Sequence, residues 1–163
     1  MNRRVLTTMT LGFLAVLFAA ALPQSGFAQS NPLLGTWKLN LAKSKFSPGP
    51  PPRSQTVNYE AVGQGLRVTA DVIDAEGNLT KVVFGPYSFD GKSYPITGAP
   101  AFDAATYKQV NNSTYESTRT KAGKAVQTTT NVLSADSKTR TLTTTGVNEK
   151  GEQINSVAIY DKQ

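Results

Sequence analysis

The sequence contains neither histidine nor cysteine in its 163 residues. Without these residues the chain cannot assemble a Ser-His-Asp or Cys-His nucleophile, and it cannot build a zinc site from nitrogen and sulfur ligands. Disulfide bridges are excluded as well, so the fold must depend on its hydrophobic core. We therefore expect a protein that is not an enzyme and that carries no cofactor.

Dense blocks of charge are also missing. The chain has 17 Lys and Arg residues against 11 Asp and Glu, a formal net charge of +6, and these residues are spread along it. This distribution is typical of a solvated surface, and we expect no nucleic-acid partner. Asp71, Asp74 and Glu76 cluster just before Gly77. Their spacing is not that of an EF-hand loop and Asp is an ordinary turn residue, so we expect no metal site.

A long apolar run covers residues 11–22, after two arginines and shortly before Ala28. A positive start, an apolar segment of about 7–15 residues and a small residue before the cut are typical of a secretory signal peptide. The run is shorter than the roughly 20 residues of a membrane-spanning helix. We expect a signal peptide at 1–28 and an exported domain at 29–163. This domain would be periplasmic or secreted, with no stable membrane insertion after cleavage.

The rest of the sequence has the alternation of β-strands. In "GLRVTADVID", which starts at Gly65, Leu66, Val68 and Ala70 alternate with polar residues, as in a strand with one buried face. Turn-forming Gly, Asn and Asp recur at intervals that suit short hairpins. The pattern predicts nine or ten strands and no amphipathic helix. A single helical turn is expected within 39–46, and "SPGPPP" at 47–52 is expected to be an irregular connector because proline lacks an amide donor.

These strands predict an all-β fold, because open edges must be closed or stacked. Sequential hairpins favour an up-and-down antiparallel β-barrel of about 8–10 strands. A two-sheet sandwich with Greek-key crossovers is the alternative.

Gly35-Thr36-Trp37 resembles the Gly-x-Trp signature on the first strand of the calycin superfamily, which includes lipocalins, fatty-acid-binding proteins and avidins. The resemblance implies a lipocalin-like barrel in which Trp37 plugs one end, Gly35 lets the chain pass close to its neighbours, and an Arg from a late strand, here Arg119 or Arg140, packs over the Trp. The opening segment at 31–52, "DGKSYPITGAP" at 90–100 and "INSVAIYDK" at 154–162 are similar to segments of bacterial secreted lipocalin-like proteins.

Candidate ligand-binding residues are Tyr115, Ser117 and Arg119, which alternate on one face of a predicted strand. Fatty-acid-binding proteins hold a carboxylate with Arg and Tyr, so the resemblance implies an anion site here. The alternative is that Arg119 points into water. Threonine runs at 127–131 and 141–146 predict either a hydrated barrel interior or a solvent-exposed sheet region.

We expect a non-enzymatic protein that binds a small apolar or amphiphilic ligand inside the barrel. The alternative is a protein-interaction module such as a periplasmic protease-inhibitor-like barrel, although the arm at 29–33 is short for insertion into a target. An outer-membrane barrel is disfavoured because the strands are rich in threonine. The sequence carries no signal for a particular oligomeric state.

Overall fold

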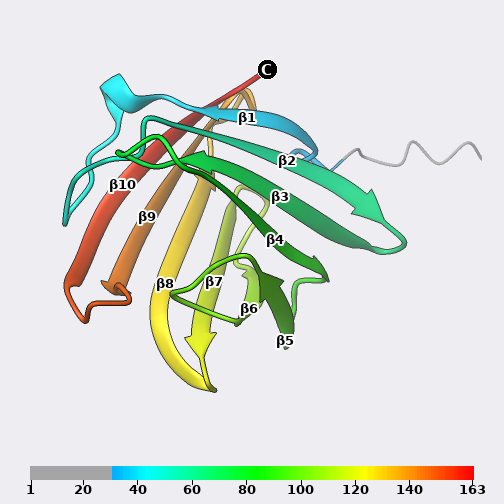
Figure 1. Cartoon of the computed structure of the whole chain (residues 1–163). Helices are drawn as coiled ribbons and strands as arrows, with labels where there is room; N and C mark the ends of the chain where they lie inside the picture. The colour runs from blue at the N-terminus through cyan, green and yellow to red at the C-terminus, as the bar shows by residue number, and fades with distance from the viewer. Residues whose placement is uncertain (1–30) are drawn as a thin grey trace, which may run out of the picture.

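The computed structural model describes residues 31–163, and the predicted signal peptide at 1–28 lies outside the described residues. Ten antiparallel strands follow one another along the chain (Figure 1). They are β1 (Gly35–Leu39), β2 (Ser54–Val62), β3 (Gly65–Ile73), β4 (Leu79–Tyr87), β5 (Asp90–Thr97), β6 (Ala104–Gln109), β7 (Thr114–Lys121), β8 (Lys124–Leu133), β9 (Thr139–Val147) and β10 (Gln153–Lys162).

The strands close into a barrel, in which each strand pairs with its sequence neighbours and β1 pairs with β10. Trp37 stands opposite Lys162 on β10 and opposite Val57 on β2, and Figure 1 shows β1 and β10 side by side. The up-and-down barrel is therefore confirmed, and the two-sheet sandwich is wrong. Short hairpins with Gly-containing turns explain the topology, because neighbouring strands can pair without crossovers.

The predicted helical turn is present as η1 (Leu41–Lys43), a 3-10 turn capped by the Asn40 side chain. It lies between β1 and the proline-rich connector. Within residues 31–163, no helix has the length and apolar character needed to cross a membrane.

The β4–β5 seam is the most sparsely paired part of the barrel. It is held in register at only two positions, Val83 with Thr97 and Phe84 with Ile96. Pro86 on β4 and Pro95 on β5 supply no amide hydrogen to a ladder. Beyond Phe84, toward the two-residue connection at Ser88 and Phe89, the strands are not held in register.

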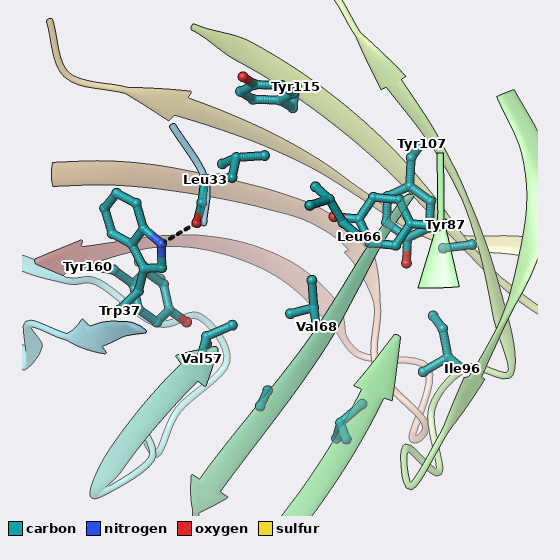
Figure 2. Packing of buried hydrophobic residues seen from close by; sticks show 14 of the residues in the cluster. Leu33, Trp37, Val57, Leu66, Val68, Tyr87, Ile96, Tyr107, Tyr115 and Tyr160 are labelled. Atoms are coloured by element: carbon teal, nitrogen blue, oxygen red, sulfur yellow. Dashed lines mark hydrogen bonds between the residues drawn. The ribbon is translucent and has the colours of Figure 1, made fainter. Parts of the chain in front are cut away.

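One end of the barrel is closed around the single tryptophan. Trp37 is fully buried, and its Nε1 donates a hydrogen bond of 2.8 Å to the carbonyl oxygen of Leu33 (Figure 2). Gly35 has a φ of +106°, and a Cβ there would make only an ordinary contact of 3.5 Å with Lys162. Glycine is thus favoured at this position by backbone conformation. The expected close approach to a neighbouring strand is not the reason.

Candidate ligand-binding cavity

The interior of the barrel contains a cavity of about 270 Å³ that is partly open to solvent. Side chains from eight of the ten strands line it, together with Leu33 and Phe46 from the segments that flank β1, and Phe89 from the β4–β5 turn. The lining has two chemically different sides, because different strands present different residue types to the interior.

The first side, here called the polar wall, comes from the inward faces of β7, β8 and β9. The strand register places its members in rows, with Ser117 beside Thr129 and Thr129 beside Thr144. The oxygen atoms of the Thr129 and Thr144 hydroxyls are 2.9 Å apart. The polar wall consists of Ser117, Arg119, Thr129, Asn131, Arg140 and Thr144.

This arrangement decides between the two readings of the threonine runs. Thr129 and Thr144 face the cavity, whereas Thr128, Thr143 and Thr145 are exposed on the outside. Because successive side chains of a strand point to opposite sides, each run contributes to both surfaces. The interior of the barrel is thus polar along β8 and β9.

The second side, here called the aromatic wall, comes from β2, β3, β4 and β6. Its most regular feature is the stacked pair of Tyr87 and Tyr107, with ring centres 3.6 Å apart and planes inclined by 11°. Figure 2 shows these rings on one side of the interior and Trp37 on the other, with Val57 and Val68 between. The aromatic wall consists of Val57, Tyr59, Val68, Ala70, Phe84, Tyr87 and Tyr107.

Arg119 reaches from β7 toward the cavity and is half-buried. Its Nη1 donates to Gln127 Oε1 at 2.8 Å, and the Gln127 amide is oriented by its own hydrogen bond to the carbonyl oxygen of Val147. The guanidinium carbon lies 4.8 Å from the ring centre of Phe102 and 5.9 Å from that of Phe84. Burial lowers the pKa of Arg119, because loss of water disfavours the charged form, yet a guanidinium stays protonated at neutral pH.

Arg140 occupies the closed end and is only 1% exposed. Its guanidinium carbon lies 4.6 Å from the ring centre of Tyr160, 4.7 Å from that of Tyr59 and 5.1 Å from that of Trp37. Its Nη1 donates to the Tyr59 hydroxyl. Of the two arginines expected from the resemblance to pack over the tryptophan, Arg140 is the one that does so.

Neither arginine has an acidic partner within residues 31–163. The two ion pairs of this part of the chain are Lys81 with Asp71 and Lys92 with Asp90, and neither involves an arginine. The lining includes a single acidic residue, Glu116, which is exposed. The cavity therefore carries net positive charge.

The tyrosines beside the cavity act as neutral hydrogen-bonding groups. Burial raises the pKa of Tyr160 to about 12, and it raises the pKa of Tyr87 and Tyr107 well above the ordinary value. The physical cause is the cost of placing a phenolate away from water. These phenols remain protonated throughout the physiological range.

Three buried polar atoms of lining residues lack a hydrogen-bond partner among the described residues. They are the Tyr107 hydroxyl, Asn131 Oδ1 and Arg140 Nε. Buried polar groups are normally satisfied by protein, water or a bound molecule. These three atoms include hydrogen-bond donors and an acceptor, so they suit a ligand that carries both acceptor and donor groups.

The three predicted ligand-binding residues all line the cavity, but they do not form one group. The Tyr115 hydroxyl donates to the carbonyl oxygen of Asn112 at 3.5 Å, and the residue stands four positions from Arg119 on β7, about 13 Å along the strand. Arg119 is accompanied instead by Gln127. Its guanidinium points to the interior, contrary to the alternative that placed it in water.

Sequence reasoning missed Gln127, Asn131 and Tyr107. The signal for the first two lay in "VQTTTNVL", where Gln127, Thr129 and Asn131 alternate with outward residues on β8. Among residues 31–163, no three acidic side chains come together as a candidate metal site.

No protein-family model matches this chain, and no curated protein matches it either. The functional argument therefore depends on the barrel and on the chemistry of its cavity.

Proposed function

We propose that this chain is an exported, non-catalytic barrel of the calycin type, lipocalin-like in architecture, which binds a small apolar or amphiphilic molecule in its interior. The observation that carries the proposal is the cavity of about 270 Å³ with one polar and one aromatic wall. Transfer of the apolar part of a ligand from water into the cavity is favourable. A polar head group can form the hydrogen bonds that water would otherwise make with the polar wall.

The calycin assignment is supported by three features of the barrel, two of them at its closed end. Trp37 is buried on the first strand, two residues after Gly35 in its positive-φ conformation. Arg140 packs over the indole ring from a late strand. The closed antiparallel order of the strands agrees with the same architecture.

Export is supported by the pattern of residues 1–28, with arginines followed by an apolar run and a small residue. A binding role without catalysis is supported by the absence of histidine and cysteine from the whole sequence. Positive charge at Arg119 favours an amphiphile whose head is anionic, because a guanidinium offers paired donors to a carboxylate.

Calorimetric titration of the purified protein with octanoate tests the proposal. We expect saturable binding at one site per chain. Ser117→Phe should abolish this binding, because Ser117 lines the cavity and a phenyl ring would fill the space. Thr118→Phe is the matched control, since the neighbouring side chain lies on the other face of β7.

Octanoate binding that survives Ser117→Phe would contradict the proposal, and so would a failure of both octanoate and one-ring aromatic acids to bind. Co-purification of a protease, detected by native mass spectrometry, would favour the protein-interaction module instead.

A further inference from the structure

The charge of the cavity limits what it can hold. Arg119 makes one hydrogen bond, to Gln127, and no ion pair among the described residues, although a guanidinium has five N–H donors in a planar fork. Its aromatic neighbours Phe84 and Phe102 contact the guanidinium without using those donors. A planar carboxylate matches the remaining donors in charge and shape.

The lining of the same cavity also has polar atoms that lack hydrogen-bond partners. Asn131 Oδ1 on β8 is a buried acceptor without a donor, and the Tyr107 hydroxyl on β6 is buried without a partner. A hydroxyl group both donates and accepts. A ligand hydroxyl can therefore donate to Asn131 Oδ1, which an unsubstituted acyl chain cannot do.

The size of the cavity favours a compact ligand. A volume of about 270 Å³ is small for a ligand-binding site. It lies just below the range of drug-sized pockets, roughly 300–1,000 Å³. A single ring with short substituents fits this space, whereas a long acyl chain would have to leave it.

The shape of the lining favours a ring. Tyr87 and Tyr107 stack on each other. The ring centre of Phe89 lies 5.0 Å from that of Tyr115 and 5.7 Å from that of Tyr87, so four aromatic rings gather at this part of the lining. Aromatic side chains pair favourably with aromatic ligands through offset stacking and edge-to-face contacts. They add less to a flexible chain, which also loses conformational freedom on binding.

We propose that the cavity binds a one-ring aromatic carboxylic acid bearing a hydroxyl group, with the carboxylate on Arg119 and the hydroxyl at Asn131. This inference rests on the proposed binding function and narrows it to a ligand class. The ring lies against the aromatic wall, and the polar wall receives both substituents.

The test is a calorimetric comparison of four probes on the purified protein. The probes are para-hydroxyphenylacetate, phenylacetate without the hydroxyl, para-hydroxyphenylacetamide without the charge, and octanoate without the ring. We expect para-hydroxyphenylacetate to bind about tenfold or more tightly than each of the others, because each comparator lacks one of the matched interactions.

Two variants assign the interactions to residues. Arg119→Met should weaken binding of the acid by about 10- to 100-fold and weaken binding of the amide less, because the amide accepts a hydrogen bond from the guanidinium but carries no charge. Asn131→Leu should bring the hydroxylated acid to the affinity of phenylacetate. Arg67→Met is the control, because Arg67 is exposed on β3 away from the cavity, and it should change nothing.

The outcomes separate this inference from the binding function itself. Octanoate binding that equals or exceeds that of the hydroxylated acid would overturn the aromatic ligand class and leave the proposed function standing. Failure of all four probes to bind would overturn both. Should Asn131→Leu not fold, the comparison of hydroxylated and plain phenylacetate on the unchanged protein decides the role of the hydroxyl.

Discussion

The guanidinium carbon of Arg140 lies 5.1 Å from the centre of the Trp37 ring, and the ammonium of Lys162 lies at the same distance from that ring. The indole N–H donates to the carbonyl oxygen of Leu33, and Lys162 Nζ donates to that of Pro32 at 2.9 Å. One aromatic ring and two cations thus hold the segment before β1 against the end of the barrel. This contact joins the beginning and the end of the described chain.

The first prediction concerns the stacking of Arg140. Arg140→Lys keeps the charge but should lower the free energy of unfolding by about 1–2 kcal/mol, because an ammonium lacks the planar face of a guanidinium and is more strongly hydrated than it. Urea denaturation followed by Trp37 fluorescence measures the effect. Arg67→Lys on the exposed face of β3 is the matched control and should change stability by less than about 0.5 kcal/mol. Equal effects of the two substitutions would contradict the stacking role.

A second prediction concerns the threonine pair inside the barrel. Thr129→Val should cost about 1 kcal/mol, because it removes the hydrogen bond between the two hydroxyls and leaves that of Thr144 without this partner. The double substitution Thr129→Val/Thr144→Val should cost less than the sum of the single ones. Thr143→Val on the exposed face of β9 serves as the control. Strict additivity in a urea-denaturation cycle would show that the two hydroxyls do not interact.

Much of the fold could be predicted from the sequence because its signals are local. The alternation of Leu66, Val68 and Ala70 and the glycine turns define strands and hairpins without reference to distant residues. Consecutive hairpins then leave few topologies. The closure between β1 and β10 joins the two ends of the described chain, so it follows from the need to cover edges rather than from any local pattern.

The candidate site could be predicted only in part, because alternation shows which residues share a face but not which face is inside. Thr128 and Thr129 are chemically identical, yet only Thr129 faces the cavity. Arg119 points inward because its guanidinium donates to Gln127 and packs against the ring of Phe102. Phe102 lies outside the β7–β8 hairpin, so no local pattern reveals this contact. Arginine is usually exposed, so composition alone favoured the wrong orientation.

The third prediction concerns alkaline pH. An unfolded tyrosine ionises near pH 10, whereas in the folded chain burial raises the pKa of Tyr160 to about 12 and that of Tyr87 and Tyr107 above the ordinary value. Above about pH 10 the unfolded chain therefore loses protons that the folded chain keeps. The stabilisation is complete below pH 10 and should fall by about 1.4 kcal/mol per pH unit for each such tyrosine as pH rises toward 12.

Urea denaturation at a series of pH values from about 9 to 12 measures this loss. In Tyr160→Phe the free energy of unfolding should fall less steeply with pH, by about 1.4 kcal/mol per pH unit, because one buried tyrosine no longer contributes. The substitution should also cost about 1 kcal/mol at neutral pH, because the Tyr160 hydroxyl donates to Gln55 at 2.9 Å. An unchanged slope in this variant would remove Tyr160 as a source of the pH dependence.

The last prediction uses two glycines with the same backbone conformation. Gly98 and Gly151 both have a φ of +80°, but a Cβ at Gly98 would stand 2.0 Å from the carbonyl oxygen of Lys81, whereas at Gly151 it would meet nothing within 4 Å. Gly151→Ala should therefore cost only the left-handed strain, about 1–2 kcal/mol. Gly98→Ala should cost about 1–3 kcal/mol more, because a backbone atom of β4 must move.

The extra cost should appear at the β4–β5 seam, since Gly98 directly follows β5 and only two residue pairs hold the strands there. Hydrogen exchange measured by mass spectrometry should show faster exchange of β4 and β5 in Gly98→Ala and unchanged exchange there in Gly151→Ala. A local opening of this kind needs little free energy where few pairs must break. Equal destabilisation by the two substitutions would mean that β4 yields to the added methyl group, and the close approach of Gly98 to Lys81 would then not contribute to the stability of the barrel.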